Sequence, residues 1–102
     1  MDDMDNILNQ ITMIKKRLNQ LENELSEIDL RADDDNGLVS IVVNGKGQMV
    51  DIHFHDEEIS KESKNALIEA VNRGQEKAQQ TRADKKQEIV GDVNIPDIPG
   101  LF

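Results

Sequence analysis

The segment from Gly37 to Phe54 constrains the fold of this chain more than any other part of its sequence. It contains two runs in which apolar and polar residues alternate, Leu38 to Val43 and Met49 to Phe54. Between the runs stand Asn44-Gly45 and Gly47, residue types that tolerate the positive φ angle of a tight connection between right-twisted strands. The segment therefore predicts a β-hairpin. Because a hairpin is not stable alone, the segments on either side must pack against it.

The segment before the hairpin predicts a long amphipathic helix followed by a strand. Its apolar residues recur at alternating spacings of four and three, which makes a narrow seam for another helix: Ile7, Ile11, Ile14, Leu18, Leu21, Leu25 and Ile28. Near Ser26 the period changes, and Ile28, Leu30 and Ala32 alternate with polar residues as in a half-buried strand. Residues 33–37 are rich in Asp, Asn and Gly and predict the turn into the next strand. The three strands would form an antiparallel meander.

The third strand and the helix after it are predicted by the same reasoning. We expect Val50, Ile52 and Phe54 to face the helices, and Met49, Asp51, His53 and His55 to face the other way. Ser60 is a good N-cap, and Gly91 is expected to end a helix that reaches about Val90. The seam of that helix loses apolar size along its length: Leu67, Val71, Gly74, Ala78, Thr81 and Lys85.

This gradient predicts that the first half of the second helix docks on the sheet, where small side chains allow close approach. Its last two turns have little to bury, and we expect them to project into solvent or toward a partner. Residues 92–102 contain Pro96 and Pro99, which predict an extended tail. Residues 1–91 would then form a single α+β domain.

Composition limits the compartment and the assembly of the protein. A chain of 102 residues with 32% charged residues and only two Phe as aromatic residues has a thin core, so we expect it to self-associate. The absence of Cys excludes a disulfide scaffold and fits a reducing compartment. The acidic N-terminus does not resemble a signal peptide, and no apolar run is long enough to span a membrane. A cytoplasmic protein without a membrane partner is the expectation.

Several motifs occur in an order that resembles one known family. The first helix leads into Asn36-Gly37-Leu38-Val39, Val43-Asn44-Gly45 and Val50-Asp51-Ile52, and later come Ala70-Val71-Asn72-Arg73-Gly74 and Pro99-Gly100-Leu101-Phe102. Over nearly its whole length the chain resembles the YbaB/EbfC family of bacterial nucleoid-associated proteins. The resemblance implies an α-βββ-α fold, a homodimer formed through the sheets, and protruding helices that hold DNA like tweezers. The residues expected at that dimer interface are Val39, Ile41, Val43, Met49, Asp51 and His53.

Charge is distributed unevenly along the chain. The net charge is −9, yet residues 60–90 carry seven basic and five acidic side chains. At about 100° per residue, the acidic residues of this helix fall on one flank, and the other flank carries basic and amide residues with no acid among them. That flank, with three basic residues of the first helix, forms the candidate surface for duplex DNA: Lys61, Lys64, Gln75, Gln79, Arg82 and Lys86, with Lys15, Lys16 and Arg17. Phosphate contacts of this kind predict salt-sensitive binding with low sequence specificity, suited to a nucleoid-organising or regulatory role.

Other readings of the chain remain open at this point. The same charges would also suit an acidic dimeric module that binds a protein and not DNA. His53 and His55 have the spacing of metal ligands, but without a third strong ligand an exposed strand face or a dimer surface is the better reading, and we expect no metal or other cofactor. No arrangement of Ser, His and Asp and no phosphate-binding loop predicts catalysis or a small-molecule substrate.

Overall fold

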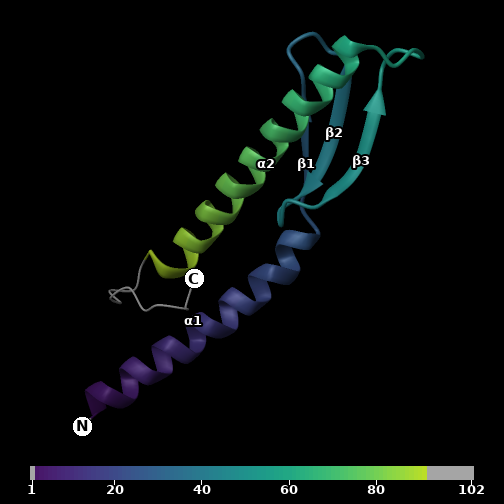
Figure 1. Ribbon diagram of the computed structural model, residues 1–102. Helices are drawn as coiled ribbons and strands as arrows, with labels where there is room; N and C mark the ends of the chain where they lie inside the picture. Colours follow the sequence, from purple (N-terminus) through teal and green to yellow (C-terminus); the bar gives the residue numbers. More distant parts are fainter. Residues whose placement is uncertain (1, 92–102) are drawn as a thin grey trace.

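The computed structural model describes the backbone of residues 2–91 and the side chains of residues 4–91. The elements follow one another as α1 (Asp2–Ser26), β1 (Asp29–Asp33), β2 (Val39–Asn44), β3 (Met49–Phe54) and α2 (Lys61–Val90). This is the α-βββ-α order and the α+β class that the sequence predicts (Figure 1). The molecule is elongated, with extents of 69 × 20 × 19 Å. No helix in this part of the chain has the length and apolarity needed to cross a bilayer.

The sheet is an antiparallel meander with the strand order β1-β2-β3. Asp34 organises the first turn: its carboxylate accepts hydrogen bonds from the backbone N–H groups of Asn36, Leu38 and Val39 at 2.7–3.0 Å. In the second turn the side-chain oxygen of Asn44 accepts from two backbone N–H groups at 3.0 Å. In both turns, side-chain oxygens thus accept hydrogen bonds from backbone N–H groups that have no partner in a neighbouring strand.

Positive φ angles occur at Gly37 and Gly47, and not at Asn44 or Gly45 as the turn sequence suggests. Gly45 is required for a different reason. Its N–H donates to the carbonyl oxygens of Leu25 and Ile28 at 2.8 and 3.1 Å, and a Cβ at this position would lie 2.8 Å from the Leu25 carbonyl oxygen. The hairpin loop is therefore fixed directly to the end of α1.

Helix α2 lies along one face of the sheet, over β1 and β2 (Figure 1). Ser60 caps it as expected, since its hydroxyl accepts from the Ser63 N–H at 3.2 Å. The helix buries a row of small residues, Ser63, Ala66, Ala70, Gly74 and Ala78, whereas Leu67 and Val71 are only half-buried. A Cβ on Gly74 would lie 2.5 Å from the Ile41 Cδ1, so the close approach expected from this glycine is confirmed.

Strand β3 lies outside the cover of α2. Ile52 pairs with the core residue Ile41, so its face is the one expected, yet Val50 and Ile52 remain 55% and 45% exposed. A register shift pairs Met49 with Val43 but Asp51 with Val42, and adjacent residues of β2 point to opposite faces. Met49 therefore lies on the α2 side of the sheet, separated from Asp51, which corrects the alternation predicted for this strand.

Helix α1 continues beyond the end of the sheet and beyond the end of α2 (Figure 1). Its seam is buried only toward the sheet: Ile14, Leu21 and Leu25 are at most 4% exposed, whereas Ile7 is 52% exposed. The last turns of α2 lie against this buried part, where Arg82 Nη1 is 3.2 Å from Glu22 Oε1. The part of the α1 seam from Ile14 to Leu25 thus packs within the chain, and the end of α2 contacts α1 in place of projecting freely.

Candidate nucleic-acid interface

Two helical segments lie side by side between the sheet and the outer half of α1, and we call them the arm: residues 15–26 of α1 and residues 81–90 of α2 (Figure 1). The two segments together hold six basic and four acidic side chains. The whole chain holds 12 basic and 21 acidic groups, so the remainder carries six basic and 17 acidic groups. The arm is therefore net positive on a strongly acidic chain, although these segments lie about 60 residues apart in the sequence.

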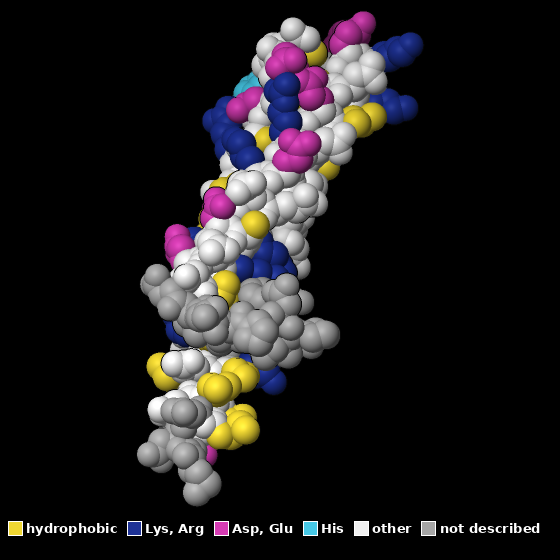
Figure 2. Space-filling model, turned by 90° about the vertical axis from the view of Figure 1, so that its left-hand side faces the viewer, with side chains coloured by type: hydrophobic (Ala, Val, Ile, Leu, Met, Phe, Trp, Pro, Cys, Tyr) yellow, Lys and Arg dark blue, Asp and Glu magenta, His cyan; other side chains and the backbone are white. Residues whose placement is uncertain are grey.

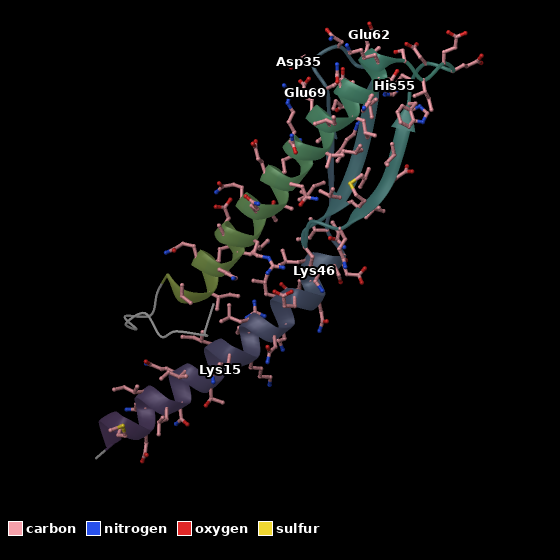
Figure 3. All side chains as sticks on the ribbon, in the orientation of Figure 1. Lys15, Asp35, Lys46, His55, Glu62 and Glu69 are labelled. Carbon is pink, nitrogen blue, oxygen red and sulfur yellow. The ribbon has the colours of Figure 1, made fainter. Side chains whose placement is uncertain are left out.

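The structure brings together five of the nine residues that the sequence assigns to a DNA surface. Lys15, Lys16 and Arg17 are exposed on α1, and Arg82 and Lys86 are half-buried on the neighbouring segment of α2. Figure 3 places Lys15 at the end of the arm that lies toward the N-terminus of α1. Lys61 and Lys64 are exposed at the start of α2, and at about 1.5 Å per residue they lie about 30 Å along the helix from Arg82. They form no single site with the arm.

The arginines of the arm are paired with glutamates of α1. Arg82 donates to Glu22 from both terminal nitrogens, at 3.2 and 3.3 Å, and its side chain is 34% exposed. Arg17 lies 3.7 Å from Glu24 and donates to Gln20 at 2.9 Å. Exposed ion pairs of this kind contribute only about 0–1 kcal/mol, so a phosphate can compete for these guanidinium groups.

Gln75 and Gln79 differ in their surroundings. The Gln75 amide donates to the Gly47 carbonyl oxygen at 2.8 Å and holds the hairpin loop against α2. Its role in the structure is thus to support the fold. Gln79 is exposed on α2, two residues before the arm.

One basic residue that the sequence analysis placed in the apolar seam belongs to the arm. Lys85 lines a groove of about 420 Å³ between the helices, together with Arg17, Leu21, Glu24, Glu88 and Ile89. The signal was present, because a seam that ends in lysine has no apolar partner and must meet polar groups. Lys46, in the hairpin loop, is also exposed at the sheet end of α1 (Figure 3).

The surface seen in Figure 2 has no continuous basic patch. Lys and Arg side chains (dark blue) are dispersed along this face among Asp and Glu (magenta), and hydrophobic side chains (yellow) gather at its lower end. A surface of this kind presents several separate positive charges and is not a deep pocket for a small anion. Such charges suit contacts with a repeating phosphate backbone.

The sheet face opposite α2 carries a polar cluster. The Ser40 hydroxyl donates to the Asp33 carboxylate, and it also contacts Arg31 at 3.0 Å and His55 Nε2 at 2.8 Å. The hydrogen bond from Ser40, followed by the Arg31 guanidinium, holds the pKa of Asp33 below its ordinary value. Because the hydroxyl proton goes to a carboxylate that stays ionised, this arrangement does not generate a serine nucleophile.

Asp51 and His53 lie beside this cluster and line a shallow pocket of about 160 Å³ with Arg31, Ser40, Val42 and His55. The rings of His53 and His55 meet edge to face, with their centroids 4.6 Å apart. Among residues 4–91 no group of three or more His, Cys, Asp or Glu side chains could hold a metal ion.

The residues expected at a dimer interface separate into two groups. Val39, Ile41 and Val43 are 0% exposed beneath α2, so they form the core of the single chain and present no surface to a second copy. Met49, Asp51 and His53 are exposed on β3. The α2 side of β3 adds Val50 and Ile52, with Ile68 of α2 also 53% exposed.

Fold and site together define a class of protein: a small α-βββ-α protein with a net-positive helical arm. The profile of the YbaB/EbfC DNA-binding family matches residues 1–93, and the chain belongs to this family. The resemblance read from the sequence motifs is thereby confirmed.

Similar proteins are named nucleoid-associated proteins, which agrees with this family. A nucleoid-associated protein of Syntrophobacter fumaroxidans is 28% identical, over 95% of this chain and 94% of its own length. A nucleoid-associated protein of Clostridium kluyveri is 26% identical, over 97% and 88%. The crystal structure of uncharacterized protein HP0035 from Helicobacter pylori shares the fold, with a TM-score of 0.71 at 22% identity over 89% of this chain and 97% of that one.

Proposed function

We propose that this protein binds duplex DNA as a homodimer, with low sequence specificity, and serves in the cytoplasm as a nucleoid-associated protein that organises or regulates DNA. The observation that carries the proposal is the concentration of positive charge on the arm of a chain whose net charge is −9. Membership of a DNA-binding family and relatives named nucleoid-associated proteins support it.

The arm would hold the phosphate backbone through Lys15, Lys16, Arg17, Arg82 and Lys85. Lysine and arginine contact phosphate oxygens without reading bases, and the described residues offer no recognition helix or β-ribbon shaped like a base-reading module. Affinity would then depend on counterion release and fall steeply with salt. The acidic remainder of the chain would repel DNA and confine contact to the arm.

A second copy would supply a second arm. The exposed apolar side chains on the α2 side of β3, Met49, Val50 and Ile52, are the surface we assign to self-association. Isolated apolar patches on a small chain mark interaction sites, and a chain with so thin a core gains stability by covering them. Two arms carried on one platform would bind DNA far more tightly than one.

The decisive measurement is a fluorescence anisotropy titration of a labelled duplex at several salt concentrations. Replacing Lys15 and Lys16 by Gln removes two exposed charges from the arm, and replacing Lys61 and Lys64 by Gln removes two from the far end of α2. We expect the arm variant to bind more weakly and its plot of log K against log salt to flatten by about 1.8, because each lost phosphate contact removes about 0.9. The matched control should bind like the wild type.

The competing function is an acidic module that binds a protein, and the pairing of Arg17 and Arg82 with glutamates favours it. No binding of duplex at about 50 mM salt, where counterion release is most favourable, would exclude the DNA proposal and leave this alternative. Equal losses in both lysine pairs would instead show that the arm is not the contact surface.

A further inference from the structure

A small apolar groove lies between α1 and the last turn of α2. It has a volume of about 190 Å³ and is lined by Gln10, Met13, Ile14, Arg17 and Ile89. Met13 is 67% exposed, whereas Ile14 is 4% exposed and forms the floor. An open apolar groove of this kind gains stability when an apolar side chain covers it.

The part of the sequence that follows α2 is suited to cover this groove. Residues 92–102 lie outside the described part of the chain, and they begin directly after Gly91, two residues beyond the groove residue Ile89. The segment contains Ile95, Ile98 and Leu101 at a constant spacing of three, with Pro96 and Pro99 after the two isoleucines and Phe102 at the end. A spacing of three places side chains on one edge of a polyproline helix.

We propose that residues 95–102 of the same chain fold back and dock in the groove formed by Met13, Ile14 and Ile89. The reach is ample, because eleven residues span at most about 36 Å and the segment begins only three residues after the groove residue Ile89. A segment attached so close to its site has an effective concentration in the millimolar range, and the loop that must close is short.

Charge supports the same occupant. The segment carries two aspartates and no basic residue, and the groove has Arg17 at its edge with Lys16 next to it on α1. The groove itself occupies residues 10–17 of α1, about two turns, with Met13 and Ile14 as its apolar residues there, whereas a helix of a second copy would be expected to cover the exposed Met4, Ile7 and Leu8 as well. An extended segment can fill so short a groove with one or two large apolar side chains.

The experiment uses the full chain and its own methionines. The chain contains no cysteine, so Asp97→Cys provides one unique site for a nitroxide label without removing an apolar residue of the segment. Methyl-labelled methionine reports from Met13 in the groove and from Met49 at the start of β3. The hairpin loop before Met49 contacts Gln75, which lies about 20 Å from Ile89 along α2. We expect the Met13 methyl signal to lose most of its intensity with the oxidised label and to recover on reduction, while Met49 keeps its signal.

Two companion measurements decide the outcome. In a chain that also carries Ile98→Asp and Leu101→Asp, the loss at Met13 should disappear, and an unchanged loss would show that the apolar side chains do not cause docking. A mixture of spin-labelled chains with separate methyl-labelled chains should show no loss at Met13. A loss in that mixture would assign the groove to the segment of a second copy, and no loss in either sample would refute docking altogether.

Discussion

At the scale of single residues, the two turns of the sheet depend on carboxylate and amide oxygens. Asp34 is 6% exposed, and the hydrogen bond from the Val39 N–H, followed by those from Asn36 and Leu38, holds its pKa below the ordinary value. A carboxylate with a lowered pKa in the folded state stabilises the fold above its unfolded pKa of about 3.9. That stabilisation is lost as the pH falls through the folded pKa.

We therefore expect Asp34→Asn to lower the melting temperature at neutral pH, because an amide offers one acceptor oxygen where three N–H groups need two. The difference from the wild type should shrink as the pH falls below about 4, where the wild-type carboxylate becomes protonated. Thermal melts from pH 2 to pH 7 measure this. Asp29→Asn, at the exposed start of β1, changes the same charge and should have little effect, and a constant difference at all pH values would contradict the prediction.

Gly74 shows how one missing side chain sets the distance between α2 and the sheet. Its Cβ would lie 2.5 Å from the Ile41 Cδ1, and Ile41 is fully buried. Overpacking costs about 1–3 kcal/mol, against about 1 kcal/mol gained when alanine replaces glycine in a helix. We expect Gly74→Ala to destabilise the protein by about 0–2 kcal/mol in urea denaturation.

Ile41→Val removes the methyl group that the new Cβ would meet. Alone it should cost about 0.5–1.5 kcal/mol, but combined with Gly74→Ala it should relieve the clash. The double variant is therefore expected to be more stable than the sum of the two single effects predicts. Simple additivity would mean that the helix moves away from β2 without strain.

At the scale of elements, sequence periodicity located every helix and strand because each change of period coincides with a change of environment. The period of α1 changes at Ser26, where the chain enters the sheet, and the cap at Ser60 gives the start of α2. The position of the end of α2 against α1 was not predictable in this way. The contact is made by the Arg82–Glu22 pair and by Lys85, and the polar seam gave no apolar signal for it.

For the candidate DNA-binding residues of α2, the sequence predicts the angular position around the helix but not the position along the helix axis. A helical projection places Lys61 and Arg82 on one flank of α2, and it contains no information on the distance of about 30 Å between them. Only the packing of α1 shows which of these charges gather in the arm. The dimer assignment of Val39, Ile41 and Val43 failed for a related reason, because alternation alone does not say which face α2 covers.

The two halves of α1 should differ in local stability. Near the sheet, Leu21 and Leu25 are at most 2% exposed, whereas Met4, Ile7 and Leu8 are 52–65% exposed. A helix gains most of its stability from packing, and short unpacked helices are marginal in water. In native-state hydrogen exchange, amides of residues 5–10 should exchange at least about tenfold faster than those of residues 20–25. Equal protection would show that the outer half of α1 is packed in solution.

At the scale of the whole molecule, the proposed function requires two arms on one platform. Ile52 is 45% exposed on β3, on the α2 side of the sheet but beyond the strands that α2 covers. An aspartate at this position would carry an unpaired charge into the proposed interface between copies, where burial of a charge is strongly unfavourable. Sedimentation at micromolar concentration should therefore show Ile52→Asp shifted toward monomer, with a dissociation constant raised on the order of 10–100-fold.

The same variant separates dimerisation from DNA contact, because position 52 lies on the sheet and not in the arm. If the arms of both copies in the dimer bind one duplex, Ile52→Asp should also weaken DNA binding, although every basic residue remains. Ile59→Asp is the matched control: Ile59 is 74% exposed in the loop between β3 and α2, so the new charge stays in water and both properties should match the wild type. A monomeric Ile52→Asp protein that binds DNA with undiminished affinity would show that one arm is sufficient.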